Sequence, residues 1–180
     1  MLTTEPKVLG AGRYLRLVTK NQWEYCERTL GVGVVILVAT IDGKLILTEQ
    51  FRPSVGKMVI ELPAGLVGDH QGAEAETMES AARRELLEET GYEANTIISL
   101  TDGPTSSGLT NEMVNFYLAT NLKKVGPGGG DATENITVHE IPLSEVERWA
   151  KTRQSEGVLV DPKIFAGVYF AAVPFAGGRR

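Results

Sequence analysis

The sequence predicts an α/β fold in which a mixed β-sheet is covered by helices on both faces. The order of elements supports this prediction, because strands are followed by one long helix, further strands and then two helices. Residues 31–39 form a continuous apolar run, which is typical of a strand buried on both faces. A helix over about residues 74–90 has an apolar stripe, so we expect it to cover one face of that sheet.

The first thirty residues predict a short β extension ahead of the main domain. Residues 8–29 alternate in the manner of short strands, and Asn21 marks a turn between two of them. We therefore divide the chain into an extension at residues 1–30 and a larger domain at residues 31–180. Cys26, the single cysteine, excludes an internal disulfide and is interpreted as a small strand residue, since no histidine lies near it in sequence.

The remaining strands follow turn signals along the chain. Asp42 and Gly43 predict a hairpin turn after the apolar run, and residues 45–47 continue as the partner strand. Further strands are expected near residues 58–60, 97–100, 114–119 and 136–141. The glycine-rich stretch 126–130 and the polar residues after it predict a flexible loop.

Two helices are expected toward the C-terminal end. Ser144 precedes Glu147 by three positions, a capping-box spacing that opens a helix toward Ala150. Asp161 followed by Pro162 predicts an N-cap with proline at the first helical position, which opens a last helix through about residue 172.

Size and charge limit the partners that the protein can have. With 180 residues, of which 42% are hydrophobic, the chain can fill the core of one domain. A net charge of -5 without a basic run argues against nucleic-acid polymers, although local arginines or a metal ion could still bind a small phosphorylated ligand. We expect a cytoplasmic protein, because a single cysteine fits a reducing compartment and neither a signal peptide nor a membrane-spanning apolar run is apparent.

The most informative segment is residues 84–92, Arg-Glu-Leu-Leu-Glu-Glu-Thr-Gly-Tyr. Residues four apart share a helix face, so Glu85 and Glu89 (the acidic pair) lie on the face that would otherwise be apolar and inward. Like charges repel more strongly in a low-dielectric interior, and a cation between them would relieve the repulsion. Oxygen-only ligands favour a hard ion, Mg²⁺ first and Mn²⁺ second. The alternative is a solvated acidic face, the more common outcome for a bare Glu-Glu pair.

Arg84 and Gly91 complete the pattern. Arg84 is placed to neutralise Glu88 but not the acidic pair, and Gly91 ends the helix where a left-handed C-cap is expected. With Glu76 eight positions before Arg84, the segment resembles the Nudix box, Arg-Glu-hydrophobic-x-Glu-Glu-x-Gly-hydrophobic. The resemblance implies a Nudix-type α/β/α sandwich with a mixed β-sheet, in which residues 31–180 are the catalytic domain.

One position departs from the family pattern. A glycine is expected six positions before Glu76, and His70 stands there. Gly65, in the lead-in Glu-Leu-Pro-Ala-Gly-Leu-Val at residues 61–67, is taken as its equivalent, and ten residues then separate it from Glu76. We interpret residues 68–75 as a lengthened loop before the helix.

The resemblance implies which residues hold the metal ion. Both members of the acidic pair would be direct ligands, together with the backbone carbonyl of Ala64. Glu88 would bind a further ion or pair with Arg84, and Arg84 would orient the carboxylates. Glu76 fits either a role in the site or that of a helix-start glutamate favoured by the helix dipole.

Residues outside the box resemble the branch of the family that contains ADP-ribose pyrophosphatases and nucleoside diphosphate sugar hydrolases. Residues 50–53, Gln-Phe-Arg-Pro, match the Gln-Tyr/Phe-Arg-Pro of that branch. The match implies that Arg52 contacts the diphosphate, for which its planar donor fork is suited. A salt bridge at the end of a hairpin is the alternative role for Arg52.

The same branch places an aromatic residue of an N-terminal strand against the nucleobase, often in the partner subunit. Residues 23–28, Trp-Glu-Tyr-Cys-Glu-Arg, resemble that element. Trp23 would stack on the base, Glu24 would read the base edge and Arg28 would touch ribose or phosphate. An exposed tryptophan on a strand is otherwise most often an interface or core residue. The resemblance also implies a homodimer in which residues 1–30 exchange or pack across the two-fold axis.

Two later loops complete the implied site. Residues 104–112 resemble the family's Ser-Pro-Gly-x-x-x-Glu loop, in which Glu112 would assist the metal site or hold the loop. Ser107 stands where ADP-ribose hydrolases commonly have proline, which leaves other nucleoside diphosphate sugars open. Glu134 matches the glutamate of a mobile loop that serves as general base, whereas His139 is interpreted as structural.

The resulting hypothesis is a Mg²⁺-dependent hydrolase that cleaves the diphosphate bond of ADP-ribose or a related nucleoside diphosphate sugar, giving a nucleoside monophosphate and a sugar phosphate. A GDP-sugar or dinucleotide diphosphatase of the same fold is the nearest alternative. A non-catalytic nucleotide-binding Nudix module is a third alternative. Such a module is expected to lose glutamates at positions 85, 88 or 89, and all three are present.

Overall fold

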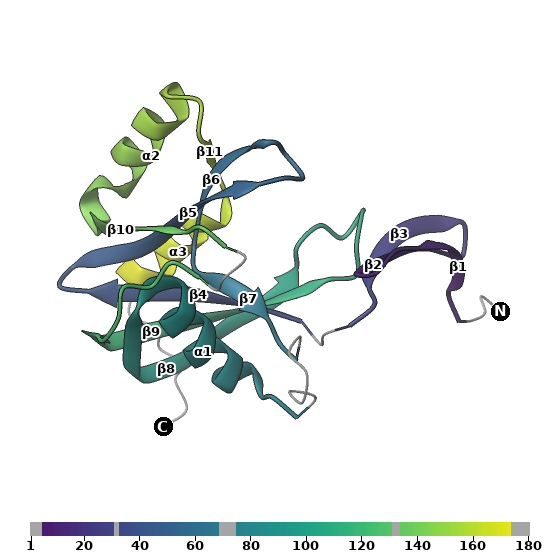
Figure 1. Cartoon of the computed structure of the whole chain (residues 1–180), viewed down its shortest axis with the longest axis horizontal. Coiled ribbons are helices and arrows are strands. Elements are labelled where there is room, and N and C mark those ends of the chain that lie inside the picture. Colours follow the sequence, from purple (N-terminus) through teal and green to yellow (C-terminus); the bar gives the residue numbers. More distant parts are fainter. Residues whose placement is uncertain (1–4, 31–32, 69–74, 131–133, 174–180) are drawn as a thin grey trace.

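The computed structural model describes residues 5–30, 33–68, 75–130 and 134–173 (Figure 1). A small antiparallel sheet at the N-terminus contains β1 (Lys7–Ala11), β2 (Leu15–Lys20) and β3 (Trp23–Arg28). It projects away from the rest of the molecule (Figure 1). Asn21 and Gln22 have positive φ values of 53° and 70° between β2 and β3, so the turn predicted at Asn21 is confirmed.

The large sheet is mixed, as expected. Its main path runs in the order β11-β6-β5-β4-β9-β8, with β10 added to β5 and β7 added to β4. The β4–β9 and β6–β11 pairs are parallel, and the other pairs are antiparallel. The strands are β4 (Val34–Ile41), β5 (Lys44–Arg52), β6 (Lys57–Glu61), β7 (Ala64–Leu66), β8 (Tyr92–Pro104), β9 (Met113–Lys124), β10 (Thr137–Pro142) and β11 (Leu159–Val160).

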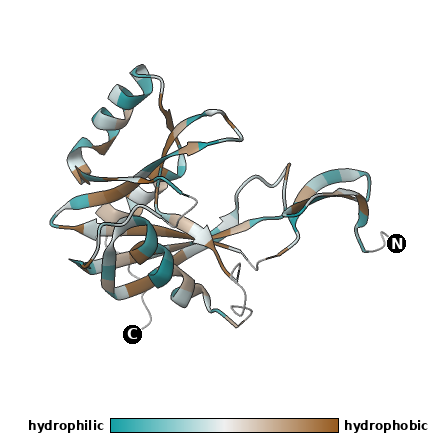
Figure 2. Cartoon of the chain, in the orientation of Figure 1, coloured by the Kyte–Doolittle hydropathy of each residue, from teal (hydrophilic) through white to brown (hydrophobic). Residues whose placement is uncertain are grey.

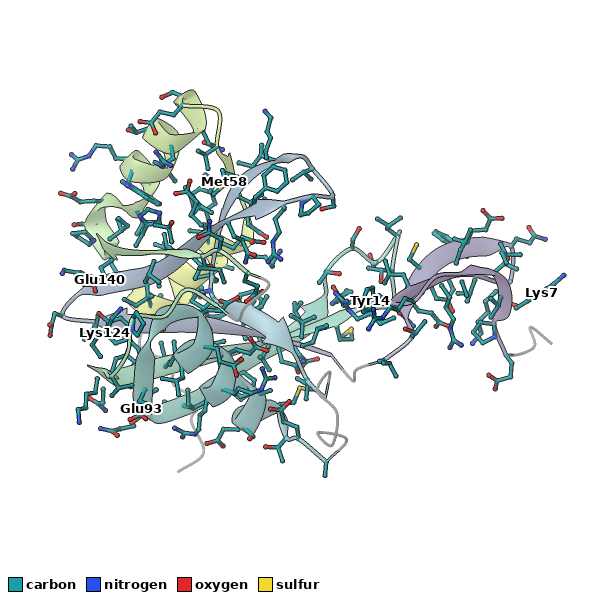
Figure 3. All side chains as sticks on the ribbon, viewed as in Figure 1. Lys7, Tyr14, Met58, Glu93, Lys124 and Glu140 are labelled. Carbon is teal, nitrogen blue, oxygen red and sulfur yellow. The ribbon has the colours of Figure 1, made fainter. Side chains whose placement is uncertain are left out.

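Helices lie on both faces of this sheet, which confirms the predicted sandwich. The helices are α1 (Met78–Thr90), α2 (Val146–Ser155) and α3 (Lys163–Ala172), with a short 3-10 helix, η1 (Leu143–Glu145), before α2. β4 shows why the apolar run is continuous: Val35 and Leu37 pack in the core under α1, whereas Ile36 and Val38 pack in the core under α2 and α3. Figure 2 shows the hydrophobic colour along the neighbouring strand β5. Residues 31 and 32, where the run was predicted to begin, lie outside the described residues.

The start of α1 differs from the prediction. The helix begins at Met78 instead of residue 74, because the Thr77 hydroxyl accepts a hydrogen bond from the backbone N–H of Ser80 (3.2 Å) and caps it there. The predicted end is confirmed: Gly91 has a φ of 72° and its N–H donates to the Leu87 carbonyl (2.8 Å). Most of the predicted loop, residues 69–74 with His70, lies outside the described residues.

The capping box predicted for α2 is wrong. Ser144 lies inside η1, and Glu145, directly before α2, already has right-handed helical dihedral angles, so no extended capping residue precedes the helix. The cap predicted for α3 is present, because Oδ1 of Asp161 accepts from the backbone N–H of Lys163 (2.8 Å). Pro162 directly precedes the first helical residue rather than being that residue. Among the described residues, no helix is long and apolar enough to cross a membrane.

Candidate active site

The acidic pair is buried on the inner face of α1. Glu85 is 8% exposed and Glu89 is 3% exposed, next to the fully buried Ala81, Ala82 and Leu86. A solvated acidic face is therefore excluded for these two residues. Glu88, one position before Glu89, points to the outer side of the helix and is exposed.

Strand β7 approaches α1 closely at the acidic pair. A Cβ atom at Gly65 would lie 1.9 Å from Cδ of Glu85, so a side chain at this position would collide with the carboxylate. The neighbouring Ala64 donates its backbone N–H to Oε2 of Glu89 (3.1 Å). The segment Ala64-Gly65 therefore lies directly against both carboxylates, as its assignment to the lead-in of the box requires.

Arg84 joins the glutamates of the box. Its guanidinium donates to Oε1 of Glu85 (2.8 Å), to Oε2 of Glu88 (3.0 Å) and to Oε1 of Glu76 (2.9 Å). The prediction that Arg84 does not neutralise the acidic pair is thus wrong for Glu85. Adjacent helical residues point in different directions, but the arginine side chain is long enough to bend round to its neighbour. Burial opposes the charge, but the bonds to Glu76, Glu85 and Glu88 hold the pKa of Arg84 above its usual value.

Glu76 has a structural role ahead of α1. Its Oε2 accepts from the backbone N–H of Gly68 (3.0 Å), and its other oxygen accepts from Arg84. Through these two bonds, Glu76 connects Gly68, which lies just after β7, to Arg84 of α1. A surface glutamate favoured only by the helix dipole would lack them.

The surroundings of Glu89 disfavour an unneutralised negative charge. Burial raises the pKa of Glu89 well above its ordinary value, and the charges of Glu85 and Glu134 raise it further, against the opposing effects of the Ala64 N–H and of Arg52. A divalent cation beside the acidic pair would instead favour the charged form of Glu89. The two buried carboxylates offer only oxygen atoms as ligands, which fits Mg²⁺ or Mn²⁺.

No complete cage of protein ligands is present in the described part of the chain. There, no group of three histidine, cysteine, aspartate or glutamate side chains is arranged to hold a metal ion.

The glycine-rich loop after β9 packs on the end of α1. Gly129 and Gly130 donate their N–H groups to the carbonyls of Glu89 (2.8 Å) and Glu88 (3.0 Å). The part of the predicted flexible loop at residues 126–130 is therefore hydrogen-bonded to the helix, and residues 131–133 lie outside the described residues. A Cβ atom at Gly130 would lie 2.4 Å from Oε2 of Glu134, so the carboxylate of Glu134 lies over this loop, beside the C-terminal turn of α1.

A pocket of about 630 Å³ opens next to Ala64. Three ion pairs stand around it: Arg28 with Glu112, Arg52 with Glu61, and Lys163 with Asp161. The lining residues are Arg28, Val34, Ile36, Arg52, Ser54, Val55, Val59, Glu61, Ala64, Thr105, Glu112, Val114, Leu159, Val160, Asp161, Pro162 and Lys163. The size suits a nucleotide-sized ligand.

Arg52 forms a salt bridge, the alternative role considered for it, and also lines the pocket. Its Nε donates to Oε2 of Glu61 (2.7 Å), so it does form a salt bridge at the end of the β5–β6 hairpin. Arg52 and Glu61 also line the pocket. The bond from Nε to Glu61 involves only one edge of the guanidinium group of Arg52. The ion pair therefore fixes the orientation of an arginine that faces the pocket.

Glu112 holds the loop at residues 104–112 to the N-terminal sheet. Its carboxylate accepts from Nε of Arg28 (2.5 Å), and Asn111 donates to Glu27 in the same strand (3.1 Å). The backbone N–H of Cys26 donates to the Leu109 carbonyl (2.8 Å). These contacts join β3 to the pocket wall, and they bring Arg28 into the pocket.

Residues 28–159 match the NUDIX domain. The chain belongs to the Nudix family. The match begins at the last residue of β3 and ends at the first residue of β11, and it includes α1 with the acidic pair.

Relatives of this Nudix chain include proteins named as pyrophosphatases of ADP-ribose or GDP-mannose. An ADP-ribose pyrophosphatase of Mycobacterium tuberculosis is 37% identical over 138 residues, which cover 76% of this chain and 63% of that protein. A GDP-mannose pyrophosphatase of Cronobacter sakazakii is 30% identical over 155 residues, 81% of this chain and 75% of that protein. The matched part spans 63–64% of the length of the first curated relatives.

A solved structure supports the fold. The crystal structure of an ADP compounds hydrolase superposes with a TM-score of 0.67 over 93% of this chain and 92% of the other, at 19% sequence identity. At this identity the likeness concerns the Nudix fold alone.

Two residues predicted to bind the base lie apart from the main pocket of the Nudix chain. Trp23 is 65% exposed and lines a second pocket of about 300 Å³ together with Tyr25 and residues of the 104–112 loop. Glu24, its neighbour on β3, is also exposed. Within one chain, neither residue is among those that line the pocket with Arg52.

Sequence reasoning missed three charged residues of the pocket: Glu61, Asp161 and Lys163. Glu61 stands in the recognised lead-in, so its place opposite Arg52 could have been considered. Nothing local indicates that Asp161 and Lys163 reach the pocket, because they arrive there through the parallel pairing of β11 with β6.

His139 has the structural role that was predicted. Its Nε2 lies 2.8 Å from Oε2 of Glu49, and its ring contacts Trp149 of α2 in a tilted arrangement, with the ring centroids 4.9 Å apart. Arg153, also on α2, donates to the other oxygen of Glu49 (2.8 Å). The cluster fastens α2 to strands β5 and β10, on the side of the sheet opposite α1.

Proposed function

We propose that the protein is a Mg²⁺-dependent hydrolase that cleaves the diphosphate bond of ADP-ribose or a related nucleoside diphosphate sugar, giving a nucleoside monophosphate and a sugar phosphate. One observation carries the proposal: two buried carboxylates lie against the segment Ala64-Gly65, and Ala64 also lines a pocket with Arg28 and Arg52. The names of the relatives, an ADP-ribose pyrophosphatase among them, support the choice of substrate class.

The proposed metal ligands are Glu85, Glu89 and the carbonyl of Ala64, with Glu88 binding a further ion or remaining paired with Arg84. When bound, Mg²⁺, or Mn²⁺ in its place, supplies charge neutralisation at the phosphate oxygens and makes water more acidic. Arg84 keeps the glutamates oriented through its bonds to Glu85 and Glu88. The carboxylates are thus positioned before any ion arrives.

The chain supplies the remaining chemistry from the pocket and its neighbouring loops. Arg52, held by Glu61, contacts the diphosphate with the free edge of its guanidinium. Glu134, beside the end of α1, takes a proton from the attacking water. Glu112 holds Arg28 at the pocket, where Arg28 reaches the ribose or a phosphate.

The nucleobase is proposed to bind across a homodimer. Trp23 of a second copy stacks on the base, and Glu24 reads its edge. The exposure of apolar residues on the small N-terminal sheet supports this arrangement, since a lone sheet would leave Leu9, Tyr14 and Leu15 in water. Residues 1–30 then form a dimerisation extension, and residues 31–180 the catalytic domain. A cytoplasmic location is proposed because the single cysteine fits a reducing compartment.

A GDP-sugar is the second candidate substrate. Ser107 replaces the proline common among ADP-ribose hydrolases, and a GDP-mannose pyrophosphatase is among the relatives. Both candidates require the same metal site and the same attack on a diphosphate, so they differ only in the groups that flank it.

The test is hydrolysis of ADP-ribose, ADP-glucose, UDP-glucose, GDP-mannose and a dinucleotide by the purified protein, with Mg²⁺ and with EDTA. We expect Mg²⁺-dependent release of a nucleoside monophosphate, and mass spectrometry in ¹⁸O-water identifies the phosphorus that is attacked. Arg52→Lys should lose most of the activity, because lysine lacks the planar fork. Lys151→Gln, on the exposed face of α2, is the control. Absence of turnover with every substrate would refute the proposal.

A further inference from the structure

The pocket crosses one end of the large sheet from edge to interior. Its lining residues come in sheet order from β11 (Leu159), from β6 (Val59), from β7 on β4 (Ala64) and from β9 (Val114). Beyond β9 follow the 104–112 loop and Arg28. Ala64, whose N–H donates to Glu89 of the acidic pair, therefore lies in the middle of the pocket, and the pocket extends to both sides of it.

The two sides differ in chemistry. One side reaches Arg28 and Glu112 near the N-terminal sheet, and the other reaches Leu159, Asp161 and Lys163 at the start of α3. A nucleoside diphosphate sugar has the same layout, because its diphosphate separates two different groups. If the reacting diphosphate lies at Ala64, one group must extend toward the start of α3.

We propose that Asp161 and Lys163 form the sub-site that recognises the sugar of a nucleoside diphosphate sugar; this inference rests on the proposed function. No described residue that lines the pocket is aromatic, so the α3 side has no platform on which a nucleobase could stack. It offers instead a carboxylate and an ammonium group above the apolar side chains of Val59 and Leu159. Hydroxyl groups on an otherwise apolar ring match this combination.

Asp161 is held so that it retains capacity for a ligand. Its N–H donates to the Ile60 carbonyl (2.9 Å), Oδ1 accepts from the N–H of Lys163 (2.8 Å), and Oδ2 accepts from Nζ of Lys163 (2.5 Å). A carboxylate has about four acceptor positions, so these two bonds leave roughly two for sugar hydroxyls. The ammonium of Lys163 has three donors, of which this bond uses one.

Substrates that share one half and differ in the other test the assignment. The first comparison is ADP-ribose against the methyl ester of ADP, which lacks sugar hydroxyls. Asp161→Asn keeps an acceptor for the N–H of Lys163 but removes the charge. It should lower kcat/KM for ADP-ribose roughly 10- to 100-fold, the range for a lost hydrogen bond to a charged group, and change kcat/KM for the methyl ester little.

The second comparison changes the base and keeps the sugar. The Asp161→Asn variant should lose the same factor with ADP-glucose as with UDP-glucose, because the sugar is identical. Lys163→Gln should show the same selective loss. If circular dichroism shows that Asp161→Asn does not fold, Lys163→Gln provides the test in its place. Glu147→Gln, which breaks an exposed pair with Lys151 on α2, is the control and should leave all four substrates unaffected.

Several outcomes would overturn the assignment. Equal losses with ADP-ribose and the methyl ester would show that Asp161 supports the site in general, and no loss with either would remove it from substrate binding. A loss that depends on the base would place the base at this side. If the unchanged protein hydrolyses none of the four substrates, the proposed function itself fails, and the assignment fails with it.

Discussion

The substitution Glu89→Gln should stabilise the metal-free protein while it abolishes Mg²⁺-dependent turnover. Glutamine has nearly the same shape as glutamate, and its side-chain oxygen can still accept from the N–H of Ala64. It removes a negative charge that is 3% exposed and lies one helical turn from Glu85. A variant that lost activity through poor folding would show the opposite change in stability.

The size of the effect follows from the position of the acidic pair. Like charges four residues apart cost about 0.2–0.5 kcal/mol on a helix surface. An effective dielectric of about 20 instead of 80 multiplies the repulsion roughly fourfold. Arg84 offsets part of the charge of Glu85, so relief of at most about 1–2 kcal/mol is expected. In a protein of this length, that free energy corresponds to a rise in Tm of roughly 2–8 °C.

Thermal melts with EDTA and with saturating Mg²⁺ provide the assay. The unchanged protein should gain about 2.7 kcal/mol at a Mg²⁺ concentration 100 times its Kd, whereas the Glu89→Gln variant should gain little. Glu147→Gln on α2 should behave as the unchanged protein in both conditions, because Glu147 is exposed. A lower Tm for Glu89→Gln in EDTA, together with an undiminished Mg²⁺ shift, would refute the assignment of Glu89 as a buried ligand.

Three further predictions follow from other contacts. Gly65→Ala should abolish turnover and lower Tm, since the new Cβ would lie 1.9 Å from Cδ of Glu85; activity and melts that match the unchanged protein would contradict the packing of β7. Tyr92→Phe should cost about 1 kcal/mol at neutral pH, because the Tyr92 hydroxyl donates to Glu140 (2.5 Å). That bond lowers the pKa of Glu140, while burial and the same bond raise the pKa of Tyr92 to about 12. The stabilisation is therefore fully present between about pH 4.3 and pH 10, the ordinary pKa values of glutamate and tyrosine. It is lost as the pH falls through the lowered pKa of Glu140 or rises through the raised pKa of Tyr92. A stability difference between Tyr92→Phe and the unchanged protein in urea that does not vary with pH would exclude this cause. Trp23→Ala should raise KM more than it lowers kcat and should leave Tm within about 1 °C, as expected for an exposed side chain; an unchanged KM would remove the stacking role.

The sequence predicts the elements whose signals are local. The run that became β4 is continuous because its alternate residues enter two different cores, and the inward position of the acidic pair follows from helical periodicity alone. The ends of elements were less predictable. Helix α1 begins later than predicted because Thr77 caps it, and α2 begins later because η1 precedes it. Alternative short-range hydrogen bonds at a helix end are close in energy, so the sequence pattern does not determine the first residue of the helix.

Contacts between distant parts of the chain could not be predicted. Arg28 and Glu112 are 84 positions apart, and their pairing depends on how the 104–112 loop docks on β3. Asp161 was recognised as a helix cap, which it is, but only the pairing of β11 with β6 carries it to the pocket. The role of Arg84 toward Glu85 was missed because spacing along a helix does not describe where a long side chain ends.

The three ion pairs around the pocket have a consequence for affinity. Arg28, Arg52 and Lys163 each already hold a carboxylate. Part of the positive charge of each residue is therefore already neutralised, so the proposed substrate gains less attraction than it would from unpaired arginines and lysine. In the proposed reaction, such a site favours moderate retention of the ligand, so that the two products leave readily.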